Sequence, residues 1–236
     1  MNTNLSASWA EFVRQFITNK GYLTVLDGLI ATLEIAVFGL IIGIVVGTLI
    51  GTVRVMPKYK LLPRILDKIC VCYVELFRGT PIVVQLLIGY WVLLPALGIS
   101  VESGVSVAVV VFGLNSGAYV SEIMRGGINS VDAGQLEAGR AVGLPYSVAM
   151  LKIVIPQAVK NILPTLGNEF IVLIKETSVV SFVAVIDLYK SFKRFGDPTY
   201  NYIIPYLMLA LTYLIMVLLI SWGVRAMEAK LKKSER

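Results

Sequence analysis

Three polar side chains lie deep inside apolar stretches of the chain, and together they could bind a small charged molecule. Arg78, Asn115 and Glu169 are each roughly 15–20 Å from the ends of their stretches, at about 1.5 Å per helical residue. Ionisable groups at this depth in a membrane usually face a cavity or one another, so this arrangement predicts a pocket. An Arg binds a carboxylate and a Glu binds an ammonium group. Because Asn115, Thr80 and Thr177 add amide and hydroxyl groups, the set suits an amino acid.

The same charges could instead pair with one another and serve only the fold. Arg78 lies three residues after Glu75, which is a suitable spacing for an ion pair on one face of a helix. We interpret Arg78 and Glu169 as site residues, because each lies deep in an apolar stretch, close to the middle of the membrane. Structural pairing is the better interpretation for Glu75, Lys175, Glu176 and the pair of Glu122 with Arg125.

The elements that must position these groups are membrane-spanning helices. Of the 236 residues, 57% are hydrophobic and 15% are charged, and the mean hydropathy is +0.80, which indicates a membrane protein. About 20 apolar residues span a bilayer, so we predict an all-α fold with five spans, near residues 25–53, 66–97, 103–125, 158–186 and 202–224. The second span contains Gly79-Thr80-Pro81, a break that would free backbone groups to line a site. The chain does not begin with a basic segment followed by a short apolar stretch and a cleavage site, the pattern of a signal peptide. We therefore expect the first span to be retained.

Positive charges predict the orientation of these spans, because short loops rich in Lys and Arg stay in the cytoplasm. One side carries Arg54, Lys58, Lys60, Arg64, Lys68, Arg125, Arg140, Lys152, Lys160, Arg225, Lys230, Lys232, Lys233 and Arg236. The other side carries only Arg14, Lys20, Lys190, Lys193 and Arg194. The N-terminus is therefore expected outside and the C-terminus inside. The net charge of +6 follows from this bias and from the acidic inner leaflet, so we expect no nucleic-acid binding.

Residues 1–22 are predicted to form an amphipathic helix on the outer membrane surface, ahead of a single transmembrane domain over 23–236. Apolar residues recur at helical spacing at Trp9, Phe12, Val13, Phe16 and Ile17. We interpret this helix as a membrane anchor, and partner binding is the alternative.

A glycine occurs every fourth residue in the first span, at Gly39, Gly43, Gly47 and Gly51. This spacing clears one helix face of side chains and lets another helix approach closely. The pattern predicts helix packing, and it leaves open whether the neighbour lies in the same chain or in a second one.

Several kinds of chemistry are excluded by residues that the chain lacks. It contains no histidine and two cysteines, which is too few for a metal cluster. It also contains no G-x-x-x-x-G-K-[ST] loop, so it cannot hydrolyse ATP by the P-loop route. We therefore expect a chain that is not an enzyme and binds no cofactor. Its energy must come from an ion gradient or from another subunit.

The predicted inner loop over 126–157 is long enough to have a structure of its own. Residues 135–142 favour a helix, Gly143 suits a left-handed C-terminal cap, and Pro145 suits the first turn of a second helix. A helix of about two turns is not stable alone in water, so it needs a groove to lie in.

This loop resembles the signature loop of permease subunits of binding-protein-dependent ABC importers. Their pattern is EAA, three residues, G, nine residues, I, one residue, LP. Glu137, Ala138, Gly143, Ile153 and Pro156 match it at every spacing, while Gly139 and Ile155 replace an alanine and a leucine. The resemblance implies that the loop, with Leu144 and Pro145 at its bend, sits in a cleft of a separate ATPase subunit that holds ATP and Mg.

Three further stretches resemble the polar amino acid permeases of this superfamily, namely ELFRGTPIVVQL (75–86), SGAYVSEIMRGGINSVDAGQ (116–135) and LGNEFIVLIKETSVVS (166–181). The resemblance implies five helices per subunit, a type I importer-like dimer with a second permease subunit, and a bacterial cytoplasmic membrane location. It also implies an extracytoplasmic substrate-binding protein that delivers a polar amino acid for alternating access.

Other functions remain open from the sequence. An ABC permease could carry another solute, such as an osmolyte or a metal–ligand complex. A secondary transporter driven by protons or sodium would need acidic relays, and few buried acids are present. A membrane scaffold would explain the glycine face but would give Arg78 and Glu169 no purpose.

Overall fold

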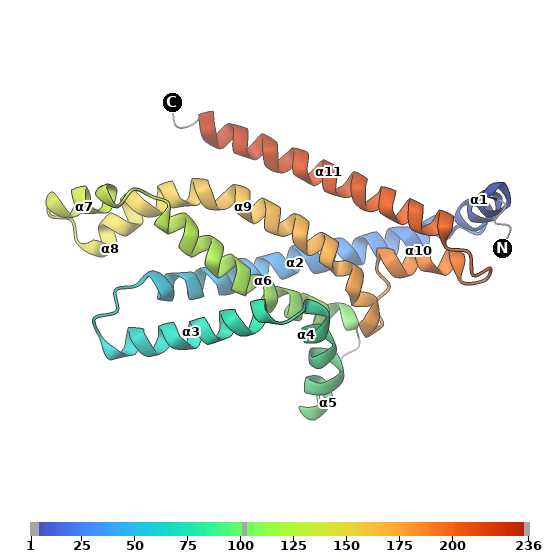
Figure 1. The fold of residues 1–236 in the computed structure, drawn as a ribbon, viewed down its shortest axis with the longest axis horizontal. Helices are drawn as coiled ribbons and strands as arrows, with labels where there is room; N and C mark the ends of the chain where they lie inside the picture. Colours follow the sequence, from blue (N-terminus) through green and yellow to red (C-terminus); the bar gives the residue numbers. More distant parts are fainter. Residues whose placement is uncertain (1–4, 101–102, 234–236) are drawn as a thin grey trace. The chain divides into compact units, whose positions relative to one another are not determined.

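The computed structural model describes residues 5–100 and 103–233, and every regular element in these ranges is helical (Figure 1). Residues 1–4 of the predicted outer helix, and Arg236 of the inner charges, lie outside the described ranges. The helices are α1 (Leu5–Val13), α2 (Gly21–Val55), α3 (Leu61–Gly79), α4 (Ile82–Ile88), α5 (Leu94–Ala96), α6 (Gly104–Asn129), α7 (Ala133–Ala141), α8 (Tyr146–Ala149), α9 (Ile155–Glu176), α10 (Leu188–Gly196) and α11 (Ile203–Lys233). Short π-helical turns η1 (Arg14–Thr18), η2 (Gly89–Leu93) and η3 (Met150–Val154), and the 3-10 helix η4 (Thr177–Val183), adjoin them.

Among the described residues, three helices are long and apolar enough to cross a membrane, namely α2, α6 and Ile203–Leu231 of α11. The interrupted pair Leu61–Gly79 and Ile82–Ala96 gives a fourth if it forms one span. The predicted span over 158–186 is not among them. Its helix α9 carries Lys160, Glu169, Lys175 and Glu176, which lower its hydropathy. The count of five spans therefore remains a prediction.

The predicted span over 66–97 is broken at Thr80 and Pro81. Proline has no backbone N–H and disfavours the helical conformation in the residue before it. Thr80 accordingly has φ −119° and ψ 144°, which is extended, and α3 ends at Gly79. The break places Arg78 in the last turn of α3.

The chain forms two compact units, which we describe separately. Unit 1 contains Met1–Gly39, Ile82–Phe112 and Val172–Ile220, and unit 2 contains Leu40–Pro81, Gly113–Ile171 and Ser221–Arg236. Helices α2, α6, α9 and α11 each begin in one unit and end in the other.

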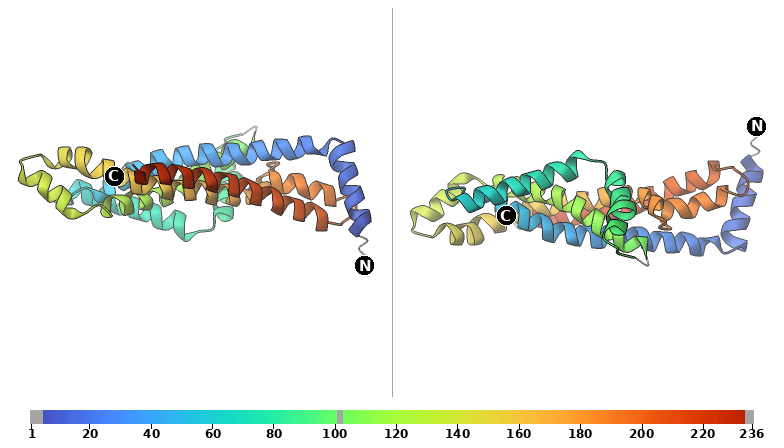
Figure 2. Two further views of the ribbon diagram at one scale, coloured as in Figure 1. Left: turned by 90° about the horizontal axis from the view of Figure 1, so that it is seen from above. Right: turned by 90° about the horizontal axis from the view of Figure 1, so that it is seen from below.

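In unit 1, the N-terminal helix packs against α10. The Phe12 ring lies 5.4 Å from the Phe195 ring, centre to centre, and the Ser8 hydroxyl and the Asn201 amide are 2.6 Å apart. Helix α1 crosses the direction in which α2 runs (Figure 2). Phe12 is buried, whereas Trp9 and Ile17 are exposed. The predicted role of this helix as a membrane anchor remains a prediction.

In unit 2, α2 and α6 approach closely along the part of the glycine face that holds Gly43, Gly47 and Gly51, and all three are buried. Gly39, in unit 1, is also buried. A Cβ atom on Gly43 would lie 2.7 Å from the Ser116 hydroxyl, and one on Gly47 would lie 2.6 Å from Val120. A Cβ on Gly51 would lie 2.9 Å from Met124. The helix that this face contacts is therefore α6 of the same chain. Val120, which faces Gly47, also joins Ala158, Ile162 and Leu166 of α9 in a buried apolar cluster.

Candidate functional site

The predicted site residue Arg78 contacts an aromatic ring on α6. Its guanidinium carbon lies 5.3 Å from the centre of the Tyr119 ring, within the range of a cation–π interaction. The alternative pairing with Glu75 does not occur among the ion pairs of the described residues. Arg78 is exposed in the single chain, so its guanidinium N–H groups can reach a ligand.

Asn115 and Glu169, the other two deep polar residues, are buried and hydrogen-bonded. The Asn115 side-chain amide donates to the Phe77 carbonyl at 3.3 Å, one residue before Arg78. The Ser116 hydroxyl donates to a Glu169 carboxylate oxygen at 3.0 Å. Asn115 is 3% exposed and Glu169 is 9% exposed. Because a buried carboxylate needs partners, Ser116 fixes the position of Glu169.

Residues 115–119 of α6 thus touch both α3 and α9 within unit 2. Sequence reasoning missed Ser116 and Tyr119, which hold the two predicted charged groups. A weak signal was present for Tyr119, which lies four residues after Asn115 and so shares its helix face, but the spacing gives no such signal for Ser116.

The hydroxyl groups of the two predicted threonines donate hydrogen bonds to nearby backbone carbonyl groups. Thr80 donates to the Leu76 carbonyl at 2.8 Å, and Thr177 donates to the Ile174 carbonyl at 2.7 Å. A hydroxyl group that donates one hydrogen bond can also accept one. Thr80 belongs to unit 2, whereas Thr177 is fully buried in unit 1.

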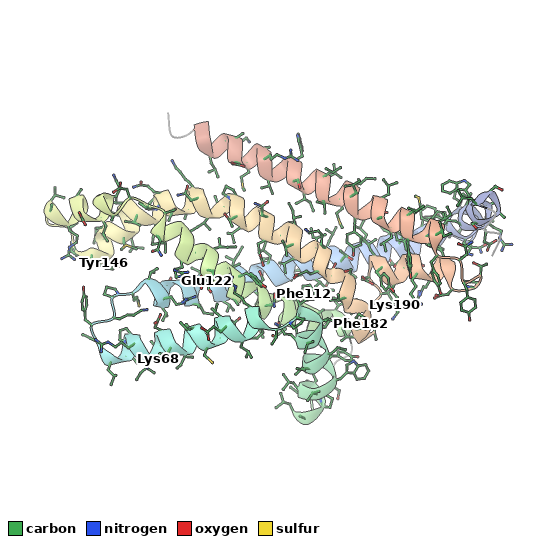
Figure 3. The ribbon with its side chains drawn as sticks, in the orientation of Figure 1. Lys68, Phe112, Glu122, Tyr146, Phe182 and Lys190 are labelled. Atoms are coloured by element: carbon green, nitrogen blue, oxygen red, sulfur yellow. The ribbon has the colours of Figure 1, made fainter. Side chains whose placement is uncertain are left out.

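Glu122 is the centre of a charged cluster near the end of α6 (Figure 3). It accepts hydrogen bonds from Arg125, at 2.6 Å and 3.2 Å, and from Arg54 at the end of α2. The pair of Glu122 with Arg125 matches the structural interpretation of these charges. Arg54 had no predicted partner, since it is far from Glu122 in the sequence. Two guanidinium groups therefore share one carboxylate.

The predicted bent segment is a pair of short helices, α7 and α8, joined at Gly143 (Figures 1 and 2). The Asp132 carboxylate caps α7 by accepting from the Gly134 N–H at 2.6 Å. At the other end, the Gly143 N–H donates to the Arg140 carbonyl and the Leu144 N–H donates to the Gly139 carbonyl. Gly143 has φ +90°, in the left-handed region that favours glycine. Together these bonds form a Schellman cap, which turns the chain before Pro145.

One face of this helix pair is exposed and the other is packed. Glu137 and Ala138 are exposed, and Val142 is 79% exposed. Gly139, which replaces an alanine of the usual pattern, is buried, and a Cβ atom there would lie 2.8 Å from Ile153. Glycine in place of alanine therefore lets α7 pack closely against the η3 turn, which leads into α9. It leaves the outer face, with Glu137 and Val142, free to contact a partner.

Comparison with known proteins identifies the family. Residues 39–233 match the model of the binding-protein-dependent transport system inner membrane component. The chain belongs to this family. The matched region includes α7 and α8 and all the residues of the polar site in unit 2.

Named relatives in this family are amino acid permeases. The chain is 43% identical to the arginine transport system permease protein ArtQ of Bacillus subtilis, over 69% of this chain and 74% of that protein. It is 40% identical to the putative glutamine transport system permease protein GlnP of Rickettsia prowazekii, over 89% of this chain and 93% of that protein.

Solved structures show the same fold. A crystal structure of an amino acid ABC transporter with histidines matches with a TM-score of 0.82 and 36% identity, over 90% of this chain and 96% of that one. The MetNI methionine ABC transporter, in inward-facing conformations, matches with a TM-score of 0.74 and 17% identity, over 89% of this chain and 97% of that one. The second likeness concerns the fold alone.

Proposed function

We propose that this chain is the transmembrane permease subunit of an ATP-driven importer that moves a polar amino acid into a bacterial cell. The observation that carries this proposal is the pairing of buried Glu169 with Ser116, on the same stretch of α6 that contacts Arg78. Both charged groups that an amino acid requires are thereby held by one helix. Family membership and the amino acid permeases among the relatives support the same function.

In this proposal Arg78 binds the substrate carboxylate and Glu169 binds its ammonium group. Asn115 and Thr80 add polar contacts from α6 and from the break after α3. Thr177 lies in unit 1, and its contribution remains a prediction from the sequence. Because an Arg on an aromatic ring is already partly oriented, less rotational freedom is lost when the carboxylate binds.

The chain itself catalyses no reaction. A separate ATPase subunit holds ATP and Mg and contacts the exposed face of α7 and α8, with Glu137, Ala138, Gly143, Leu144 and Pro145 forming and turning that surface. A second permease subunit completes the membrane dimer, and an extracytoplasmic binding protein delivers the amino acid. Five spans, with the N-terminus outside and the C-terminus inside, place α7 and α8 in the cytoplasm. ATP then shifts a two-state equilibrium between outward-open and inward-open forms.

The proposal is tested by co-purifying the chain with its ATPase subunit, reconstituting both in lipid, and adding the binding protein with glutamine or arginine. We expect ATPase stimulation and uptake with one of these amino acids. Uptake that follows an imposed sodium or proton gradient, without a co-purifying ATPase, would show that the proposal is wrong.

A Gly143→Val variant tests the contact with the ATPase. Valine is strained at φ +90°, so the bend between α7 and α8 should change while the membrane helices still insert. We expect ATP hydrolysis that no longer drives uptake. Gly143→Asn is the matched control, because asparagine tolerates the left-handed conformation, and it should keep most of the uptake.

A further inference from the structure

A cavity of about 540 Å³ lies in unit 2 beside α7 and α8. Its walls come from the ends of α2 and α6, the middle of α3, the start of α7, the first residue of α8, the η3 turn and the adjoining connections. Tyr146, the wall residue from α8, is labelled in Figure 3. The volume is within the range of small-molecule sites in proteins. None of the site residues assigned above to substrate binding lines this cavity.

The cavity walls carry charges of both signs, and not all of them are paired. Lys58 and Asp67 neutralise one another at 2.6 Å. Arg54 and Arg125 share the single carboxylate of Glu122, so one positive charge is left over at this end. Several guanidinium N–H groups remain free to bind a second carboxylate in the bidentate manner typical of Arg.

The surplus negative charge lies at Asp132, at the start of α7. One of its oxygens accepts the Gly134 N–H at 2.6 Å, and the residue forms no ion pair among the described residues. The cavity therefore offers one unmatched cation and one unmatched anion among the described residues, and Val71, Ile128 and Met150 add apolar wall. This combination fits a zwitterion with an apolar or mixed side chain. It suits a simple anion less well, because Asp132 would repel one.

We propose that this cavity is a second binding site for a zwitterionic amino acid, entered from the cytoplasm, through which imported substrate slows its own uptake. The ligand carboxylate binds the Arg54 and Arg125 guanidinium groups, and its ammonium group binds Asp132. The identity of the ligand and the side of entry rest on the proposed function.

The position of the cavity explains why occupancy would slow transport. Arg125 belongs to α6, and Asp132 opens α7, the helix that we propose to contact the ATPase. A ligand that bridges them holds the 129–133 connection in one arrangement. A ligand that binds one of two states more tightly shifts the equilibrium toward it, so the transport cycle slows.

The test uses the reconstituted complex of permease, ATPase and binding protein. Proteoliposomes are preloaded with unlabelled glutamine or arginine, whichever is taken up, and the initial rate of labelled uptake is measured against the internal concentration. We expect internal amino acid to inhibit the wild type. Its amide derivative, which lacks the carboxylate, should not inhibit.

The decisive variants are Asp132→Asn and Asp132→Ser, because both residues cap a helix as well as Asp does and keep α7 intact. Each removes the charge for the ammonium group, so half-inhibition should need about tenfold more internal amino acid, as expected for the loss of one charged hydrogen bond. Asp27→Asn, an exposed Asp outside the cavity, should be inhibited like the wild type.

The possible outcomes separate this inference from the proposed function. Normal uptake without inhibition, or equal inhibition in the wild type and both Asp132 variants, overturns the second site and leaves the proposed function standing. No uptake of any polar amino acid by a complex that hydrolyses ATP overturns the proposed function, and the amino acid ligand of this cavity with it.

Discussion

At the scale of single residues, one short stretch of α6 connects the chemistry of the molecule. Asn115 contacts α3, Ser116 contacts α9, and Tyr119 carries the Arg78 guanidinium. Asn115 and Tyr119 are four residues apart and share one face of the helix, whereas Ser116 points about 100° away from Asn115 and reaches a different helix. A rotation or shift of α6 would therefore move the groups proposed for both ends of the substrate together.

Replacing Ser116 with alanine tests the importance of this support. The variant removes a hydrogen bond to the buried Glu169 carboxylate, which should cost about 1.5–3 kcal/mol and let the carboxylate move. We expect the KM for uptake to rise about tenfold or more, with normal membrane insertion. Ser121→Ala is the matched control, since the buried Ser121 hydroxyl donates only to the Ala118 carbonyl of its own helix. Equal uptake kinetics in both variants would show that the Ser116 hydroxyl does not position Glu169 for the substrate.

The buried carboxyl group of Asp187, in unit 1, should make the stability of the protein depend on pH. It caps α10 by accepting the Lys190 N–H at 2.9 Å, while its other carboxylate oxygen is buried without a hydrogen-bond partner among the described residues. Burial raises the pKa of Asp187 from 3.8 to about 6, against the opposing effect of the backbone N–H groups at the start of α10.

A raised pKa for a carboxyl group means that the folded state binds the proton more tightly than the unfolded state does. Stability is therefore lost as the pH rises from about 4 through about 6, by roughly 3 kcal/mol at most. Asp187→Asn keeps a capping residue and removes the titration. In the detergent-solubilised complex, the melting temperature of the variant relative to that of the wild type should rise between pH 5 and pH 8. A constant difference in melting temperature between the two proteins across this range would contradict the prediction.

At the scale of elements, the close contact of α2 and α6 depends on the absence of side chains on α2. A Cβ atom on Gly47 would lie 2.6 Å from Val120 and 2.8 Å from the backbone nitrogen of Ser121. Backbone atoms cannot move aside as a flexible side chain can, so the two helices would have to separate.

Gly47→Ala should therefore lower the stability of the complex, by about 1–3 kcal/mol, as overpacking of a core does. Gly223→Ala is the matched control. A Cβ at Gly223 in α11 would meet nothing within 4 Å from the rest of the described residues, so alanine should be neutral or stabilising there. The melting temperature of each complex is the measurement. A Gly47→Ala complex as stable as the control would show that α2 and α6 do not pack this closely.

The elements also show what the sequence could predict. Local patterns were informative, because a glycine repeat, a Gly143 cap and a Thr80-Pro81 break each depend on neighbouring residues. Long-range partners were not predictable. Arg54 bonds Glu122 across 68 residues, and Ser116 bonds Glu169 across 53, so both contacts depend on how each helix is rotated. Helix α9 gives way to the 3-10 helix η4 at Thr177, inside a stretch predicted to be one span, and no proline or glycine marks the change.

At the scale of the whole molecule, the open question with the largest consequence is whether α9 crosses the membrane. If it does, the segment before it and the segment after it lie on opposite sides, and α7 and α8 can meet a cytoplasmic ATPase. The four ionisable residues in α9 raise the cost of a span, but Glu169 is already paired with Ser116 inside the protein.

Cysteine labelling decides this point. The free thiols Cys70 and Cys72 are first replaced with alanine. Single cysteines are then placed at Val142, which is 79% exposed, and at Tyr200, which is 80% exposed. We expect a membrane-impermeant maleimide to label Tyr200→Cys in intact cells, and Val142→Cys only after the membrane is opened. If α9 does not cross, Tyr200 lies on the cytoplasmic side with Val142, and neither position is labelled in intact cells. Labelling of Val142→Cys in intact cells would instead place α7 and α8 outside the cytoplasm and rule out the proposed contact with the ATPase.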